Sequence, residues 1–316
     1  MTEELGRVLL SLVDEGRPLR PSMLYALSGL GPDQLAEVQT AWKRASTDRT
    51  RAVLRALVEL TEIMIDADFT ALFRWWLGDE DAEVRLLAIE GLWEDEDVGL
   101  VGSLLRLLKD DDQPAVRAAA AASLGRFVLL GELGQINAAV GARAEQALLE
   151  AYFTFEEALE VRRRALEAVA YSSEAGVSDL IDDAYHEGEE EMCLSALLAM
   201  GRSADRRWRP LLIQELDNPS PAMRYEAAQA CGELELRDAV PALARLIDVE
   251  DVEVRDMAIE ALGKIGGAGA RRILGECWVR GDDVLQAVVE EALLQASWLG
   301  DEELEVLDDW SLAEPW

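Results

Sequence analysis

The chain has 316 residues, of which half are hydrophobic, and its 63 acidic and 30 basic residues give a formal net charge of −33. A surface this negative repels phosphate backbones and anionic lipids, so neither nucleic acid nor a membrane is an expected partner. No apolar run approaches the roughly 20 residues of a membrane-spanning helix, and the acidic N-terminus does not resemble a signal peptide. The three cysteines form no CxxC pair, and we therefore expect a cytoplasmic protein.

Residues 1–44 precede the regular part of the chain. Apolar spacing predicts helices near Glu3–Asp14, Ser22–Gly29 and Pro32–Arg44. We expect these helices to form an N-terminal cap that covers the apolar face of the first full repeat.

A recurring phrase fills residues 45–300. Its clearest copies run from Glu83 to Leu92 and from Glu253 to Gly263, and each contains an arginine that we use as the marker of its repeat. Neighbouring markers are 31 to 34 residues apart, apart from one gap of 45, and a period of this length is typical of a solenoid of stacked units. The marker positions are Arg51, Arg85, Arg117, Arg162, Cys193, Arg224, Arg255 and Gln286.

Each repeat is predicted to contain two helices, the second of which carries the marker. In the second helix a large apolar residue precedes the marker, a small one follows at +3 and another apolar one at +7, which together form one apolar stripe. Glycines at +8 are predicted to end this helix as left-handed C-terminal caps. The gap of 45 residues is longer than the usual period, and its additional residues, at 128–141, predict an inserted turn or a lengthened helix. The four glycines are Gly125, Gly201, Gly232 and Gly263.

The strings around the markers, of the form D/E-x-x-V-R-x-x-A-x-x-A-L-G, resemble the HEAT-repeat family, in particular the short bacterial HEAT-like repeats of the phycobilisome-lyase type. The resemblance covers residues 45–299. It implies an all-α fold, a right-handed α-solenoid (superhelix) of about eight HEAT-like helical hairpins. It also implies that an acid and the marker arginine link neighbouring layers, in a ladder that Cys193 and Gln286 would interrupt. The remaining residues, 301–316, are expected to form an acidic C-terminal cap or tail.

The loop inside each predicted hairpin is acidic. These carboxylates either form a row for a cation or a basic partner, or they stabilise the positive N-terminus of the helix that follows. Asp81 with Arg85, and Asp251 with Arg255, also stand four residues apart, which predicts ion pairs within one helix.

Catalytic and metal sites have little support in the sequence. His186 is the only histidine, so a metal site would need carboxylates alone, and no nucleophile lies near it for a triad. The HEAT-repeat deoxyhypusine hydroxylases, to which the chain is similar in fold, carry iron on several His-Glu pairs, whereas this chain has only His186-Glu187. We expect no cofactor, no metal and no catalytic residue.

Positions +1 and +5 of the second helix point away from the apolar stripe and are predicted to bind a partner. Leu194, Leu198 and Tyr225 would form an apolar spot on this face, unless the stacked array buries them. The predicted partner-binding residues are Leu86, Glu90, Arg163, Glu167, Leu194, Leu198, Tyr225, Gln229, Asp256, Glu260 and Glu291.

Together these features predict a non-catalytic scaffold that binds another protein, basic if charge decides, on a concave acidic surface. The alternative is a subunit, catalytic or not, of an enzyme complex similar to the bilin lyases. A third hypothesis, a nucleic-acid enzyme similar to the HEAT-like alkylpurine glycosylases, conflicts with the strongly negative net charge of the chain. The acid excess fits either a basic ligand or a high-salt environment, and the oligomeric state stays open.

Overall fold

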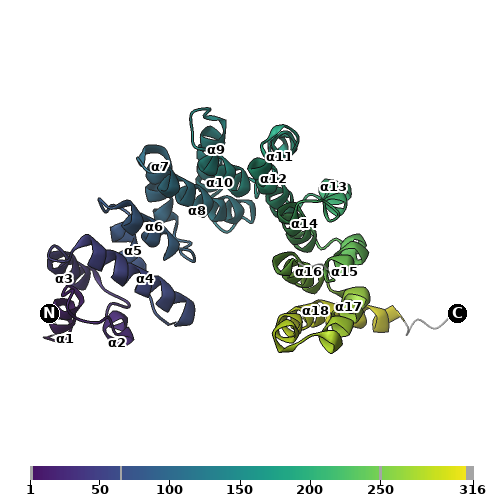
Figure 1. Ribbon diagram of the computed structural model, residues 1–316. Helices are drawn as coiled ribbons and strands as arrows, with labels where there is room; N and C mark the ends of the chain where they lie inside the picture. The colour runs from purple at the N-terminus through teal and green to yellow at the C-terminus, as the bar shows by residue number, and fades with distance from the viewer. Residues whose placement is uncertain (1–2, 65, 249–250, 311–316) are drawn as a thin grey trace. The chain divides into compact units, whose positions relative to one another are not determined.

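The computed structural model describes residues 3–64, 66–248 and 251–310, and the surroundings of side chains for 5–64, 66–186, 188–248 and 251–297. Every regular element within these residues is a helix (Figure 1). The chain divides into two compact units, Met1–Ala168 and Val169–Trp316. We call them unit 1 and unit 2 and describe each by itself.

Unit 1 begins with three helices at the places where the sequence predicts them. The last of these, α3, is followed by the long α4, whose Arg49 is buried and donates to the carbonyl oxygens of Leu12, at 2.6 Å, and Ser11, at 3.3 Å. These are carbonyls that the end of α1 leaves without a partner inside the helix, so α4 fastens the N-terminal helices. The division of the chain at residue 44 stays a prediction. The elements are α1 (Glu3–Leu12), α2 (Pro21–Tyr25), α3 (Pro32–Trp42) and α4 (Thr47–Ile63).

The rest of unit 1 alternates first and second helices. The second helices α4, α6 and α8 pack in succession, and Val84, Ala88 and Leu92 of the α6 segment form the predicted buried stripe. The elements are α5 (Thr70–Trp76), α6 (Ala82–Glu90), η1 (Val98–Leu100), α7 (Val101–Asp110), α8 (Pro114–Glu132), α9 (Ala138–Phe153) and α10 (Leu159–Val169), the last residue of which belongs to unit 2.

The extra residues at 128–141 lengthen two helices. α8 has 19 residues and α9 has 16, and they cross where Gly131 and Gly141 face each other. A Cβ on Gly131 would lie 3.0 Å from the Cα of Gly141, so the crossing depends on the absence of side chains at both positions. Of the two expected outcomes, the lengthened helix is the one observed.

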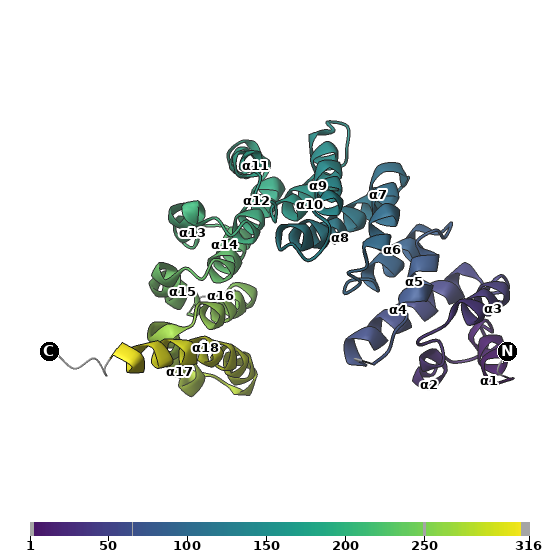
Figure 2. The same cartoon turned by 180° about the vertical axis from the view of Figure 1, so that it is seen from behind.

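In unit 2 the second helices α12, α14, α16 and α18 pack side by side. The first helices line the other side of this row, as the views from front and back agree (Figures 1 and 2). The elements are α11 (Ala175–Glu187), α12 (Glu190–Arg202), η2 (Arg206–Trp208), α13 (Arg209–Glu215), α14 (Pro221–Glu233), η3 (Arg237–Ala239), α15 (Val240–Leu246), α16 (Val252–Ile265), α17 (Gly267–Arg280) and α18 (Asp283–Trp310).

The expected acidic cap or tail at 301–316 lies outside the residues whose side chains the structure describes. Helix α18 extends as far as Trp310, and residues 311–316 are not described.

The glycines at +8 do not end the second helices, so this prediction is wrong. All four lie inside helices, and the left-handed glycines of the described chain are Gly29, Gly134, Gly266 and Gly267 instead. The glycines at +8 face the alanine at +6 of the next layer. A Cβ on each would lie 2.9–3.0 Å from the alanine Cα, so glycine allows the helix backbones to approach closely. The four contacts are Gly125–Ala168, Gly201–Ala230, Gly232–Ala261 and Gly263–Ala292.

Candidate functional site

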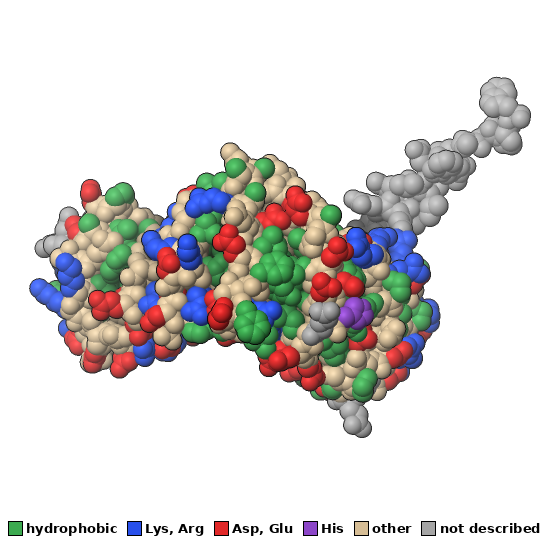
Figure 3. Space-filling view, turned by 90° about the horizontal axis from the view of Figure 1, so that it is seen from above, with side chains coloured by type: hydrophobic (Ala, Val, Ile, Leu, Met, Phe, Trp, Pro, Cys, Tyr) green, Lys and Arg blue, Asp and Glu red, His purple; other side chains and the backbone are tan. Residues whose placement is uncertain are grey.

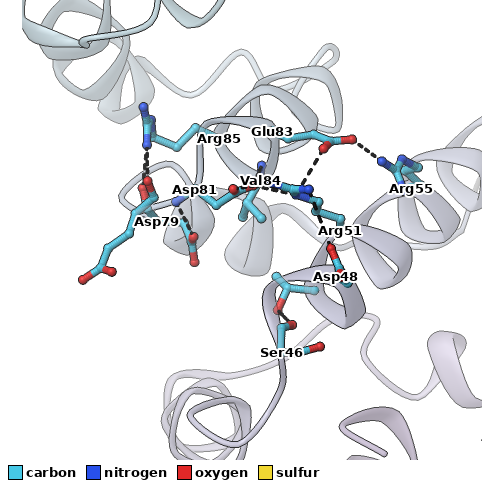
Figure 4. A network of polar contacts seen from close by, with 11 residues as sticks. Ser46, Asp48, Arg51, Arg55, Asp79, Asp81, Glu83, Val84 and Arg85 are labelled. Carbon is cyan, nitrogen blue, oxygen red and sulfur yellow. Dashed lines mark hydrogen bonds and ion pairs between the residues drawn. The ribbon is translucent and has the colours of Figure 1, made fainter. Parts of the chain in front are cut away.

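A ladder of arginine–carboxylate pairs joins the layers of unit 1. Arg51 on α4 donates to both carboxylate oxygens of Asp81, at 2.9 and 2.6 Å, and Asp81 in turn accepts from the backbone N–H of Val84 at the start of α6 (Figure 4). Asp81 therefore caps the start of α6 and also binds α4, the second helix of the preceding layer. Its predicted ion pair with Arg85 inside one helix is wrong, because the carboxylate faces the earlier layer.

The same arrangement recurs in the next two layers. Arg85 donates to Asp111 at 2.7 and 2.8 Å, and Arg117 donates to Glu157 at 3.0 and 2.6 Å. Both arginines also donate to backbone carbonyls of the loop before their own helix. The cross-layer links that the family resemblance implied are thus confirmed in unit 1.

The ladder is partly withdrawn from solvent. The side chain of Arg85 is 10% exposed and that of Asp111 is 4% exposed. Hydrogen bonds from Arg51 lower the pKa of Asp81. Burial, the largest single effect, would raise the pKa of Asp111 and Glu157, but the hydrogen bonds from arginine, a backbone hydrogen bond and the arginine charge together outweigh it, so both values are lowered. These acids are engaged within the fold, which favours the structural role over a row of ligands.

In unit 2 an aspartate still caps the start of α16, but the marker arginine of this helix makes a different contact. Asp251 accepts from the backbone N–H of Val254 at 3.1 Å, and Arg255 contacts the adjacent Asp256 at 2.8 Å rather than the expected Asp251. Arg224 donates to the backbone carbonyls of Asn218 and Pro219, in the loop before its own helix, as the unit 1 arginines do. The expected interruption is seen at Cys193 and Gln286. The Cys193 thiol donates to the Tyr185 carbonyl oxygen and the Gln286 amide donates to that of Trp278.

The predicted partner-binding residues fall on both units. In unit 1, Glu90 is exposed, whereas Leu86 and Arg163 are half-buried. Glu167 is only 3% exposed and accepts from Arg164 at 2.7 Å, so the prediction that it faces solvent is wrong. A carboxylate buried this far requires a charged hydrogen-bond partner, and the adjacent turn of α10 supplies one.

In unit 2 the predicted residues lie along the row of second helices. Glu260 and Glu291 are exposed, and the rest are half-buried. The half-buried residues are Leu194, Leu198, Tyr225, Gln229 and Asp256.

A groove of about 750 Å³ lies over α14, α16 and α18. Its floor includes the buried Met257 and Ala292, and the half-buried Tyr225 and Val288 also line it. Four of the predicted residues are therefore brought together, and Leu194, Leu198 and Gln229 are not among the residues that line it. The lining residues are Tyr225, Glu253, Asp256, Met257, Glu260, Lys264, Val288, Glu291, Ala292 and Gln295.

The groove is negative despite its one lysine. Lys264 donates to Glu233 at 2.7 Å and to Glu260 at 2.9 Å. Burial alone would lower the pKa of this lysine, but the two carboxylates outweigh burial and raise it, so Lys264 stays charged. Burial, and after it the charges of nearby glutamates, raise the pKa of the Tyr225 phenol.

Sequence reasoning missed the groove residues that lie outside positions +1 and +5. A signal was present at position +9, which lies one helical turn after +5 and therefore on the same face of the helix. This position recurs with the 31-residue period. In unit 2, Arg202 lies over the ring of Tyr171, 5.4 Å from its centroid, and Lys264 pairs with Glu233. Each of these contacts joins the +9 residues of successive layers. The column is Tyr171, Arg202, Glu233, Lys264 and Gln295.

A second cavity, of about 970 Å³, lies in unit 1 between α3, the start of α4 and the loop after α5. It is lined by Trp42, Trp75 and the acids of 79–81, together with Lys43. Trp42 donates to Thr50 at 2.9 Å, and Asp81 belongs to the ladder. Three residues that line this cavity, Trp42, Thr50 and Asp81, are thus already engaged in contacts that hold α4 and α6 in place.

The groups suited to nucleophilic or metal chemistry are dispersed. The His186 side chain is 60% exposed, 3.6 Å from Asp182, and is the purple residue on the surface in Figure 3. Burial raises the pKa of the Cys231 thiol to about 12 and also raises that of Cys193 and Cys277, which weakens each as a nucleophile. Among the described residues no three His, Cys, Asp or Glu side chains converge as metal ligands would. Nor does any described helix have the length and apolarity to span a bilayer.

The fold and the repeated Gly–Ala contacts define an α-helical repeat protein built from stacked hairpins. The chain belongs to the HEAT repeats, whose family profile matches residues 70–170 and 209–294. None of the curated proteins matches the chain.

Several solved structures are similar to the chain. The complex of CpcE and CpcF of phycocyanin lyase from Nostoc sp. PCC7120 is 19% identical with a TM-score of 0.52, over 73% of this chain and 92% of that one. Kap95p, solved with RanGDP, is 16% identical with a TM-score of 0.47, over 78% and 35%. Human deoxyhypusine hydroxylase in complex with glycerol is 19% identical with a TM-score of 0.36, over 93% and 96%. At 19% identity and a TM-score of 0.52, the likeness to the phycocyanin lyase complex extends to the fold alone.

Proposed function

We propose that this chain is a non-catalytic, cytoplasmic scaffold that binds another protein on the exposed face of its second helices in unit 2. The observation that carries the proposal is the groove over α14, α16 and α18, where Tyr225, Asp256, Glu260 and Glu291 meet. Residues at the same repeat positions on successive helices thereby form one continuous surface. Helices fixed by close Gly–Ala contacts lose little freedom on binding, which favours affinity.

Charge restricts the partner. The chain carries a formal net charge of −33, and four carboxylates and one ammonium group line the groove. A basic partner is drawn to such a surface, whereas nucleic acid and anionic membranes are repelled. Binding is therefore expected to weaken as salt is added, because salt screens exposed charges beyond about 8–10 Å.

The test is capture of the partner by wild-type protein and by two matched variants. Glu260→Lys with Glu291→Lys reverses two charges in the groove, and Glu235→Lys with Glu276→Lys makes the same charge change at exposed sites outside the lining. A stoichiometric protein that is retained by wild type and by the control, but lost from the groove variant, supports the proposal. Equal retention by both variants refutes the placement of the surface.

A second candidate function is a subunit of an enzyme complex similar to the bilin lyases. The solved phycocyanin lyase complex, which has the same fold at 19% identity, favours this candidate. An absorption spectrum of the purified complex separates the two. A bound chromophore that persists through gel filtration supports the second candidate, and a colourless stoichiometric complex supports the first.

A further inference from the structure

The repeat itself shows where the groove lacks a cation. On α16 the ammonium of Lys264, at +9, pairs with Glu260, at +5 of the same helix, and with Glu233, at +9 of α14. One layer further on, the position equivalent to Glu260 is Glu291, but the position equivalent to Lys264 is the neutral Gln295. Layer α18 therefore repeats the carboxylate of the pair and omits its counterion.

The other end of the groove has a similar excess of negative charge. Glu253 and Asp256 lie on the first turns of α16, and Asp256 is paired with Arg255 at 2.8 Å. Within the described residues, neither Glu253 nor Glu291 forms an ion pair with a basic side chain, and both are exposed. Two carboxylates on the neighbouring helices α16 and α18 of one groove are thus available to a cation from outside.

Tyr225 adds an aromatic surface to the same groove. It lies on α14, is half-buried and lines the groove together with the apolar Met257 and Val288. A planar guanidinium stacks on an aromatic ring and can pair with a carboxylate in the same pose, whereas an ammonium group is a compact point charge. The chain already contains such a contact on the same row of helices, where Arg202 lies over Tyr171.

We propose that the groove over α14, α16 and α18 binds an extended, arginine-bearing segment of a partner protein. The guanidinium stacks on Tyr225 and pairs with Glu253, and a further basic side chain of the segment pairs with Glu291. This inference rests on the proposed scaffold function and adds the chemistry of the ligand. The volume of about 750 Å³ accommodates several side chains, and sites of this size hold ligands larger than a single amino acid.

The full-length protein, with its methionine methyl groups labelled with ¹³C, provides a local readout. Met257 lines the groove, whereas Met23 and Met64 lie in unit 1. The probes are acetylated hexa-arginine and hexa-lysine peptides in about 0.15 M salt, where long-range attraction is screened. We expect the Met257 signal to shift to saturation with hexa-arginine, and several-fold more weakly with hexa-lysine, while the unit 1 signals stay in place.

Charge-matched variants separate the groove from the general acidity of the surface. Glu253→Gln with Glu291→Gln is expected to weaken hexa-arginine binding about tenfold. Glu235→Gln with Glu276→Gln removes the same charge at exposed positions outside the groove, and should leave the dissociation constant within about twofold. Tyr225→Leu is expected to remove the preference for arginine over lysine.

Three outcomes overturn the inference: a Met257 signal that does not move, equal weakening in the two double variants, or equal affinity of wild type for both peptides. If the peptides fail in this way but the charge-reversed groove variant still loses its stoichiometric partner, the scaffold function stands and the arginine ligand is rejected. If that partner is retained as well, both proposals fail.

Discussion

The contact between Gly232 and Ala261 predicts a sharp difference between two glycine-to-alanine substitutions in unit 2. In Gly232→Ala the new Cβ would lie 2.9 Å from the Cα and 3.2 Å from the Cβ of Ala261, on the facing helix α16. Comfortable carbon–carbon contacts are about 3.5–4.0 Å. Because the contacting atoms belong to backbone or lie next to it, no rotamer change relieves the clash, and α14 and α16 must separate.

The magnitude follows from two opposing effects. Overpacking of this kind costs about 1–3 kcal/mol, whereas replacing glycine inside a helix by alanine gains about 1 kcal/mol. Gly275→Ala in α17 is the matched control, since a Cβ there meets nothing within 4 Å and the substitution receives only the helix gain. The difference between the two variants cancels the helix term and isolates a packing cost of about 1–3 kcal/mol.

Urea denaturation followed by circular dichroism measures both variants against wild type. We expect Gly275→Ala to be as stable as wild type or more stable, and Gly232→Ala to be less stable than Gly275→Ala by the amount given above. Equal stability of the two variants would refute the reasoning, because the layers would then tolerate a methyl group at their closest approach.

Three further predictions concern the charged groups. Asp111→Asn removes the almost fully buried partner of Arg85 and should cost about 2–4 kcal/mol, whereas Asp112→Asn, whose side chain is 80% exposed, should cost no more than about 1 kcal/mol; similar denaturation midpoints for the two would contradict the ladder. The ladder carboxylates have lowered pKa values, so their stabilisation is present above the unfolded-state pKa of about 4 and is lost as the pH falls through the folded-state values; a melting temperature that does not decrease between about pH 5 and pH 3 would refute this. Because the net charge of −33 makes the chain repel itself, adding KCl to about 1 M should raise the melting temperature even though it weakens single ion pairs; a decrease on addition of salt would show that the ion pairs dominate.

The period of the sequence was sufficient to predict the helices and their buried stripe. A marker followed by a small residue at +3 and an apolar residue at +7 permits only a helix buried on one side, and the structure has such helices at Ala82–Glu90 and Val252–Ile265. The lengthening at 128–141 was visible as a departure from the period. Its form was not, because local sequence does not contain the contact of Gly131 with Gly141 at which the two lengthened helices cross.

The errors arose where the answer depends on the neighbouring layer. Gly232 after an apolar helix satisfies the local rule for a C-terminal cap, but its contact with Ala261 is an interaction between helices that local sequence does not contain. Asp81 was assigned to Arg85 by spacing along the helix, whereas the bidentate pair with Arg51 crosses 30 residues. Glu167 was placed outside by its position, although the fold buries it beside Arg164.

The Gly–Ala contacts at +8 and +6 show that different positions of a second helix serve for stacking and for presenting side chains on the surface. Stacking is fixed by these small residues and by the apolar stripe, while the residues at +1, +5 and +9 differ from layer to layer, as Tyr225, Asp256 and Ala287 do at +1. A transplant of these columns from one such array to another would consequently carry over ligand preference. The +9 column has to be moved whole, because its residues pair across layers, as Lys264 does with Glu233.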